Sequence, residues 1–239
     1  MWRLLTFVCV FGFSYHAHAS YTLLTIDLRP AGYIESYQPK GIHYDVINEI
    51  AERAQIEYVS KVKPYARVVH EMKNGTAAMS LLFYDRTLEQ DVIYVAPVLQ
   101  TNLAVLSSVD KPVRSLNDLV GQKVGVLRKA LAIGKVPYLD QATPYLLKDY
   151  LQGVEMVYRG RLDSMIGADL AIYHAMQKLK RRKSDFNPLL IIQPKEVLLV
   201  VSKGLGHEVL LNKLKGAIDN IKKDGTIDKI VENYTEYEP

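Results

Sequence analysis

The sequence predicts an exported α/β protein built as two lobes, and three observations lead to this prediction. Apolar segments with strand alternation are followed by segments with helical periodicity, which is typical of α/β folds with largely parallel sheets. Each half of the chain contains a predicted helix that ends at a glycine, Gly75 or Gly160, and leads into an apolar strand. The N-terminal residues have the composition of a secretory signal.

The first 19 residues are expected to be removed after export. Arg3 supplies a positive charge, residues 4–13 form an apolar run, and Ala17-His18-Ala19 provides the small residues that precede a cleavage site. The apolar run is shorter than the ~18 residues that a membrane-spanning helix needs. We therefore expect cleavage after Ala19 and a periplasmic mature chain, rather than an uncleaved membrane anchor.

Composition argues against several classes of function. The single cysteine, Cys9, lies within the signal, so the mature chain is expected to hold no disulfide, thiol nucleophile or thiolate metal site. The net charge of +4 is too small and dispersed to predict nucleic-acid binding. The basic run 178–183 follows a predicted helix, whose C-terminus favours cations. We expect no cofactor and no metal.

In the first half, apolar periodicity predicts strand, helix, strand, helix and strand in turn. The second helix is expected to start at Pro64, because proline suits the first turn. The expected elements are strand 21–27, helix 42–54, strand 56–62, a helix from 64 to 74 and strand 77–83.

The second half is expected to repeat this plan. Two further extended segments are expected to cross between the lobes, and Ser115-Leu-Asn-Asp has the form of a capping box. The expected elements are strand 123–127, helix 145–159, strand 162–167, the crossings 96–108 and 196–202, and helix 207–223.

Four local patterns, in order and at suitable spacing, carry a resemblance to a known family. They are Gly41-Ile-His-Tyr-Asp45, Pro64-Tyr-Ala-Arg67 with Lys73-Asn-Gly75, Ser115 to Gly125, and Lys223-Asp-Gly-Thr226. Over the mature chain the sequence resembles the extracellular solute-binding proteins of family 3. The resemblance implies a type II periplasmic-binding-protein fold, in which two α/β lobes joined by two crossing strands close on a ligand in the cleft between them.

The resemblance also implies a domain division and partners. Lobe 1 is expected over 20–103, lobe 2 over 104–195, and the return crossing with C-terminal helices on lobe 1 over 196–239. The implied partners are a small-molecule ligand and an ABC permease, or a membrane sensor in its place. We expect a monomer that binds no nucleic acid.

The family's ligand-binding arginine has no counterpart here. In the family it follows the strand after the second helix and pairs with the ligand carboxylate, whereas this chain has Gln90 at the implied position. Arg86 or Arg67 is a possible substitute, and a surface arginine paired with Asp85 or Glu89 is an equally good interpretation of Arg86. The family's aspartate for an α-ammonium group is retained as Asp169, which is also suited to capping a helix from Leu170.

Aromatic residues complete the expected cleft. Tyr33 follows the first strand, Tyr65 occupies the family's tryptophan position, and Phe83 or Tyr84 ends a strand, where α/β ligand sites collect. Where the family has a glycine- and hydroxyl-rich turn, this chain has Arg128-Lys129-Ala130-Leu131. The expected ligand is an amino acid or an amine-like molecule.

An enzyme on the same fold is the alternative. The family fold also carries a cyclohexadienyl dehydratase that acts on prephenate-like substrates. The sequence has no nucleophile elbow, Walker loop or His-Glu-x-x-His helix. Its histidines are isolated, and Glu196 is a single carboxylate on a crossing strand. We therefore expect a binding protein and no catalytic residue.

Overall fold

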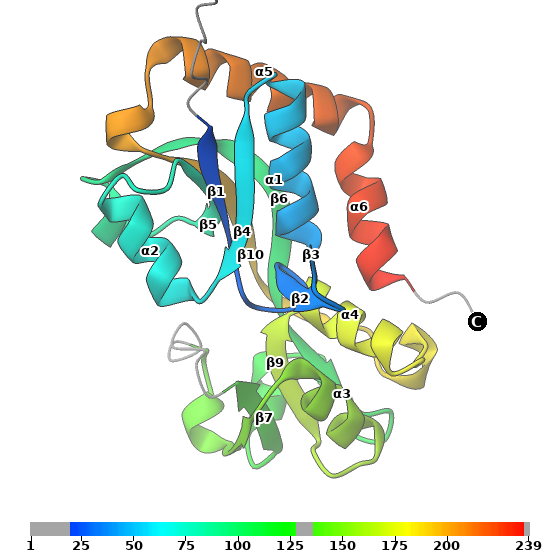
Figure 1. Cartoon of the computed structure of the whole chain (residues 1–239). Helices are drawn as coiled ribbons and strands as arrows, with labels where there is room; N and C mark the ends of the chain where they lie inside the picture. The colour runs from blue at the N-terminus through cyan, green and yellow to red at the C-terminus, as the bar shows by residue number, and fades with distance from the viewer. Residues whose placement is uncertain (1–19, 128–135, 237–239) are drawn as a thin grey trace, which may run out of the picture.

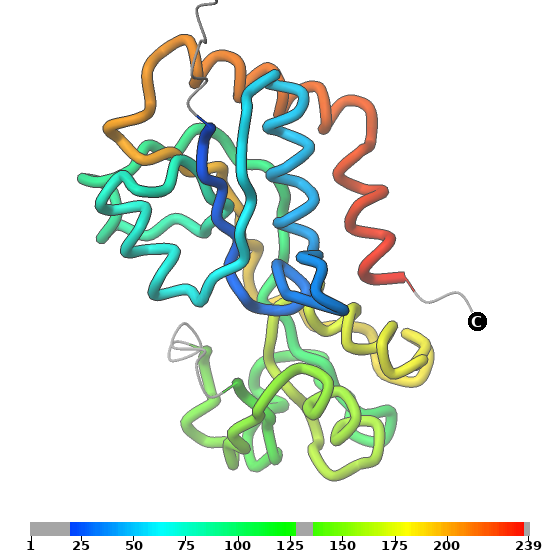
Figure 2. The backbone as a smooth tube through the Cα atoms, in the orientation of Figure 1, coloured from blue at the N-terminus to red at the C-terminus, as the bar shows by residue number. Residues whose placement is uncertain are grey.

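Two long antiparallel strands organise the molecule. The computed structural model describes residues 20–127 and 136–236, so the expected signal segment lies outside the described residues. Strands β6 (Val92–Ser107) and β10 (Leu190–Ser202) pair from Val92 with Ser202 to Val105 with Leu190. They run through a narrow waist between an upper and a lower lobe (Figures 1 and 2). The expectation of two crossing strands is confirmed.

Within the described residues, the strands form one eight-stranded sheet in the order β4-β1-β5-β10-β6-β9-β7-β8, with a separate two-stranded hairpin. The neighbours of the crossing pair change at the waist. Strand β5 pairs with β10 at residues 197–201, whereas β9 pairs with β6 at residues 103–107. Each crossing strand therefore belongs to the sheet of one lobe at one end and to the sheet of the other lobe at the other end.

Lobe 1 has helices on both faces of its sheet. Strands β1 (Tyr21–Ile26), β4 (Tyr58–Lys63) and β5 (Met79–Phe83) are parallel. Because successive strand residues face opposite sides, Leu23 packs with α1 (Ile42–Arg53) and α5 (Glu208–Lys223), while Leu24 packs with α2 (Tyr65–Lys73). Each fully buried leucine stabilises the fold by roughly 1.5–3 kcal/mol.

Lobe 2 repeats this design on a smaller scale. Strands β7 (Lys123–Leu127), β8 (Thr143–Leu147) and β9 (Ser164–Ala168) continue the sheet. Met165 of β9 packs with α3 (Tyr150–Tyr158) and α4 (Asp169–Lys178), whereas Ile166 faces the other side, toward the turn Leu116–Leu119. That turn carries the predicted capping box at Ser115 and is a 3₁₀ turn.

Lobe 1 also contributes two elements that approach lobe 2. Helix α6 (Thr226–Thr235) lies above α4, and the hairpin β2 (Tyr33–Glu35) with β3 (Gln38–Lys40) sits beside them (Figure 1). The Nδ1–H of His174 in α4 donates to the Tyr234 carbonyl at 2.8 Å, and Gln177 Nε2 donates to the carbonyls of Asn233 and Glu236. These contacts join the lobes beside the crossing strands.

Two sequence-based expectations were wrong in detail. The helix expected over 145–159 begins only at Tyr150, because Thr143–Leu147 pair in parallel with β7 and Asp149 caps the helix by accepting a hydrogen bond from Gln152 N at 2.8 Å. Asp169 is the first residue of α4, not the cap of a helix from Leu170. The glycine ends of α2 and α3 are confirmed, since Gly75 and Gly160 have φ of 67° and 65°.

Candidate functional site

A small apolar cavity of about 100 Å³ lies where the two lobes meet. Lobe 1 contributes residues that follow or end its parallel strands and the start of α1, while lobe 2 contributes the start of α3 and α4. The crossing strand β6 contributes Thr101. The lining residues are Ile26, Leu28, Arg29, Pro30, Ala31, Ile42, His43, Phe83, Thr101, Tyr150, Ala168, Leu170 and Ala171.

A larger cavity of about 610 Å³ adjoins the small one, and the two share Leu28, Arg29, Tyr150 and Ala171. Its charged lining residues are Asp27, Arg29, Lys148 and Asp149. The two cavities together form a cleft, hereafter the interlobe cleft; the small apolar cavity is called its inner end, and the larger cavity, which holds the four charged residues, is called its outer part. Such a combination suits a small ligand with an apolar body and a charged or polar head.

Arg29 is a charged group of the interlobe cleft that two side chains of the β2–β3 hairpin hold in position. Its guanidinium lies 3.8 Å from the ring centre of Tyr33, and its Nη1 donates to Glu35 Oε1 at 3.3 Å. Hydrogen bonding from Arg29 is the main cause that holds the pKa of Glu35 below its usual value. Glu35 is also within 3.4 Å of Lys40 Nζ and 3.7 Å of Lys178 Nζ.

His43 lines the inner end as a neutral group. Burial lowers its pKa to about 4, although a hydrogen bond to the Leu81 backbone opposes this shift. Its Nδ1 is closed off from solvent and has no hydrogen-bond partner. The imidazole is therefore uncharged at neutral pH, and the inner end holds no cation at this position.

Asp169 lies at the waist, with a buried carboxylate that is already satisfied. Its Oδ1 accepts from Thr101 Oγ1 at 2.6 Å, from Asn102 N at 3.0 Å and from Leu170 N at 2.7 Å, while Oδ2 accepts from Asn102 Nδ2 at 2.6 Å. The carboxylate thus ties β6 to the start of α4. The residues on either side of it, Ala168 and Leu170, line the cavity.

Of the other predicted site residues, only Phe83 lies on the cavity lining, with about half of its surface exposed. Tyr33 is buried beneath Arg29, and its ring centre is 6.0 Å from that of His174 and 6.5 Å from that of Tyr234. It therefore supports the cleft from behind Arg29.

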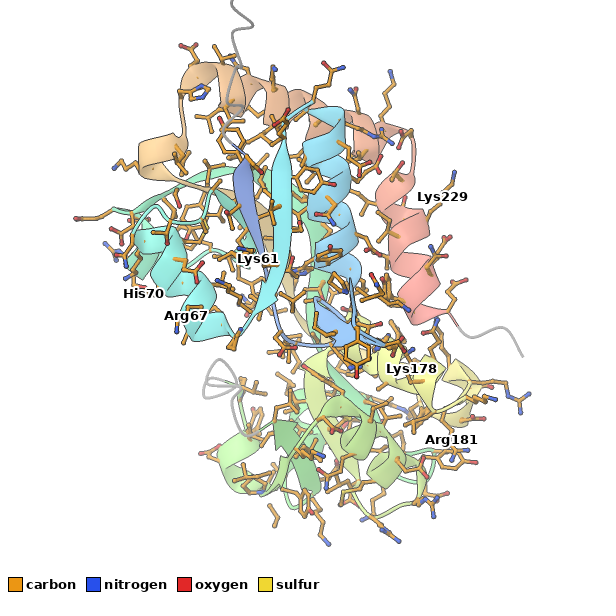
Figure 3. The ribbon with its side chains drawn as sticks, viewed as in Figure 1. Lys61, Arg67, His70, Lys178, Arg181 and Lys229 are labelled. Carbon is orange, nitrogen blue, oxygen red and sulfur yellow. The ribbon has the colours of Figure 1, made fainter. Side chains whose placement is uncertain are left out.

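The remaining predicted residues lie in lobe 1, outside the lining. Tyr65 starts α2, and Figure 3 shows Arg67 on the same helix, away from the β2–β3 hairpin. Arg86 lies in a 3₁₀ turn after β5, and Gln90 is exposed just beyond it. The turn beginning at Arg128 lies outside the described residues.

Sequence reasoning missed Arg29, His43, Thr101, Tyr150 and Lys148. Arg29 was the easiest of these residues to predict from the sequence, because it follows the first parallel strand, where α/β ligand sites collect. Thr101 and Tyr150 carry no comparable local signal, since they reach the cleft only through the crossing of β6 and the packing of α3. Among residues 20–127 and 136–236, no cluster of His, Cys, Asp and Glu is suited to a metal ion, and no helix has the length and apolarity of a membrane span.

Two lobes joined by two crossing strands, with a cleft lined from both, define a hinged ligand receptor. The chain belongs to the bacterial extracellular solute-binding proteins of family 3, whose family model matches residues 23–237. A relative, the amino-acid-binding protein AabA of Dichelobacter nodosus, is 23% identical over 215 residues, which cover 87% of this chain and 84% of that protein.

Solved structures share the fold at low sequence identity. The second substrate-binding domain of Lactococcus lactis GlnP, in an open conformation, has a TM-score of 0.71 at 19% identity and covers 92% of this chain and 97% of its own. An ancestral cationic amino acid solute-binding protein has a TM-score of 0.74 at 17% identity, covering 91% and 95%. A histidine kinase sensor domain has a TM-score of 0.68 at 16% identity, covering 93% and 99%.

Proposed function

We propose that this solute-binding protein captures a small polar ligand, an amino acid or an amine-like molecule, in the interlobe cleft and closes on it. The observation that carries the proposal is that both lobes and the crossing strand line one cavity. A ligand that contacts both lobes favours the closed state, because only that state offers all of its contacts. The amino-acid-binding relative supports the ligand class.

The proposal assigns roles to the predicted site residues. Phe83 contacts the ligand, and Asp169 holds the lobe 2 wall in place. Tyr33 supports the guanidinium of Arg29. Tyr65, Arg67, Arg86 and Gln90 lie in lobe 1 outside the lining, and we keep them as predicted contacts that require movement of their own side chains, because closure leaves distances within lobe 1 unchanged.

We place the lobe boundaries at 103/104 and 195/196. The sheet neighbours of β6 and β10 change close to these residues, which supports this division. Closure then requires backbone rotation near Thr101 to Leu103 and near the residues of β10 that pair with them. The mature protein is proposed to be a periplasmic monomer that is released by cleavage after Ala19.

The proposed partner is an ABC permease that receives the ligand from the closed protein. The similarity to a histidine kinase sensor domain favours a second candidate, a membrane sensor that detects the closed form. Co-purification of the ligand-loaded protein from membranes with a permease supports the first candidate, whereas co-purification with a kinase ectodomain supports the second.

A thermal-shift screen of residues 20–239 against amino acids, amines, organic acids and small sugars tests the binding function. We expect at least one compound to raise the melting temperature of the wild type, and Phe83→Ala to reduce that rise. Val209→Ala, an exposed position on α5, is the matched control. A screen without any shift, or a shift that Phe83→Ala leaves unchanged, contradicts the proposal.

The enzyme alternative is tested on the same preparation. Prephenate is incubated with the protein and its conversion is followed by absorbance. We propose that the protein is not an enzyme and expect the substrate to persist. Turnover above the level of a heat-denatured control contradicts this.

A further inference from the structure

We propose that Arg29 binds a carboxylate of the ligand, so that the ligand is an organic acid or an amino acid and not a plain amine. This inference deepens the proposed function and rests on it. It concerns an arginine on the loop after β1, whereas the sequence comparison directed attention to the segment after β5, where Gln90 lies.

The position of Arg29 is the first support. It lines both cavities of the interlobe cleft and faces Tyr150 and Ala171, which belong to lobe 2. A ligand held by Arg29 therefore lies between the lobes, with the apolar inner cavity on one side and Lys148 of lobe 2 in the outer cavity.

The guanidinium is also held in one orientation. Its 3.8 Å contact with the ring of Tyr33 uses the flat face of the group, and Tyr33 is only 4% exposed, so the platform itself is fixed. Of the five N–H donors of a guanidinium, the contact with Glu35 uses one on Nη1. Stacking leaves the edge available for the paired hydrogen bonds that a carboxylate accepts.

Glu35 does not neutralise Arg29, because it is shared. Its carboxylate lies within 3.3 Å of Arg29 Nη1, 3.4 Å of Lys40 Nζ and 3.7 Å of Lys178 Nζ, so three cations surround one anion. Figure 3 shows Lys178 on α4, below the β2–β3 hairpin. The excess positive charge on this side of the cleft favours an anionic ligand group.

Two of the three carboxylates at the cleft are already engaged by protein donors and do not favour a plain amine. Asp169 is enclosed by four hydrogen bonds from protein groups, and Asp149 accepts the N-cap hydrogen bond of α3 from Gln152 N. Asp27, beside Arg29 in the outer cavity, is placed to attract an ammonium group next to the carboxylate. The lining thus accepts either a simple carboxylate or the two charges of an amino acid.

Three probes that share the leucine side chain show whether binding needs the carboxylate, the ammonium group or both: leucine, 4-methylpentanoate, which lacks the amino group, and 3-methylbutylamine, which lacks the carboxylate. For every amino acid that raises the melting temperature in the thermal-shift screen, the analogues without its amino group and without its carboxylate join the set of probes. Binding is measured by calorimetry on the wild type, Arg29→Gln, Arg29→Lys and Arg159→Gln. Arg159, at the end of α3, is the matched control, because it also pairs with a glutamate, Glu155, that a second cation contacts, and it lies outside the lining of both cavities.

We expect only carboxylate-bearing probes to bind. Arg29→Gln should weaken their binding by roughly 10- to 100-fold, as expected for the loss of a charged hydrogen-bonding group. Arg29→Lys keeps the charge but loses the paired N–H donors, so its affinity should lie between those of the wild type and Arg29→Gln, while Arg159→Gln should stay within about twofold of the wild type. Melting temperatures without ligand verify that each variant is folded.

Binding of amines by the wild type, or unchanged carboxylate affinity in a folded Arg29→Gln, overturns the inference and leaves the proposed function standing. If Arg29→Gln does not fold, Arg29→Lys decides: wild-type affinity in that variant overturns the inference. If no probe of any class binds the wild type, both the inference and the proposed function fail.

Discussion

Thr101 Oγ1 donates a hydrogen bond of 2.6 Å to Asp169 Oδ1, and this bond connects a crossing strand to the first residue of α4. Thr101 also lines the inner cavity. The same contact therefore links the waist, the lobe 2 wall and the interlobe cleft. The structure gives Asp169 a positioning role that does not depend on a ligand.

Replacing Asp169 by alanine is expected to destabilise the protein by about 3 kcal/mol, because it leaves Thr101 and Asn102 with buried donors that lack their acceptor. Urea denaturation of the ligand-free protein measures this loss. Asp228→Ala removes an exposed acid from the first turn of α6 and is the control. Equal urea midpoints for Asp169→Ala and the wild type would show that the waist does not depend on this carboxylate.

Gly41 is expected to tolerate no side chain. It has φ of 135°, and an added Cβ would lie 2.4 Å from the Ala31 carbonyl oxygen, so the backbone of the loop before β2 would have to move. We expect Gly41→Ala to cost several times more than Gly75→Ala, which meets only the φ penalty of ~1 kcal/mol at a position with open space around it. Chemical denaturation of both variants gives the comparison, and similar losses would contradict this account.

His43 predicts a pH dependence of stability. Its pKa is about 4 in the folded protein and 6.5 in the reference state, so the unfolded chain takes up the proton first as the pH falls. The contribution of the neutral imidazole is complete above pH 6.5 and is lost as the pH falls toward 4. The free energy of unfolding of the wild type, relative to His43→Gln, should fall by roughly 2–3 kcal/mol between pH 7 and 4.5. A pH-independent difference would contradict the burial of this ring.

Tyr234 is expected to stabilise the attachment of α6. Its hydroxyl donates to Asp45 Oδ2 at 2.6 Å and accepts from Gly41 N at 3.0 Å. Tyr234→Phe removes both bonds and should cost about 1–3 kcal/mol at neutral pH. The substitution should also raise the pKa of Asp45 further. Burial raises this pKa, and the hydrogen bond from Tyr234, which Tyr234→Phe removes, lowers it. Tyr37→Phe, at a side chain that is almost wholly exposed, is the control, and an equal effect of the two changes would refute this role.

Most of the fold follows from local patterns in the sequence. The strand β1, the helix α1 and the glycine at the end of α2 were expected because alternation, helical period and a left-handed turn each leave a local signature. Strand β8 was mistaken for helix because its apolar residues Tyr145 to Leu147 are too few to distinguish the two periods. The β2–β3 hairpin was missed because each strand has only three residues.

The site was less predictable than the fold, because its contacts are made in space. Position at the end of a strand was enough to select Phe83. The direction of the Asp169 carboxylate depends on donors 67 and 68 positions away in the chain, which no local pattern reveals. Arg29 owes its importance to stacking on Tyr33 and to the sharing of Glu35, and both arise only when the hairpin folds back beside the loop.

Closure of the two lobes is the central claim, and a distance between them tests it most directly. The only cysteine is Cys9 in the expected signal, so residues 20–239 accept spin labels at two introduced cysteines, Ala66→Cys on α2 of lobe 1 and Asp140→Cys in lobe 2. Electron–electron resonance then measures the label separation without and with a saturating ligand from the thermal-shift screen. The account predicts a shift of the distribution to shorter distances. An unchanged distribution, with ligand bound, would contradict it.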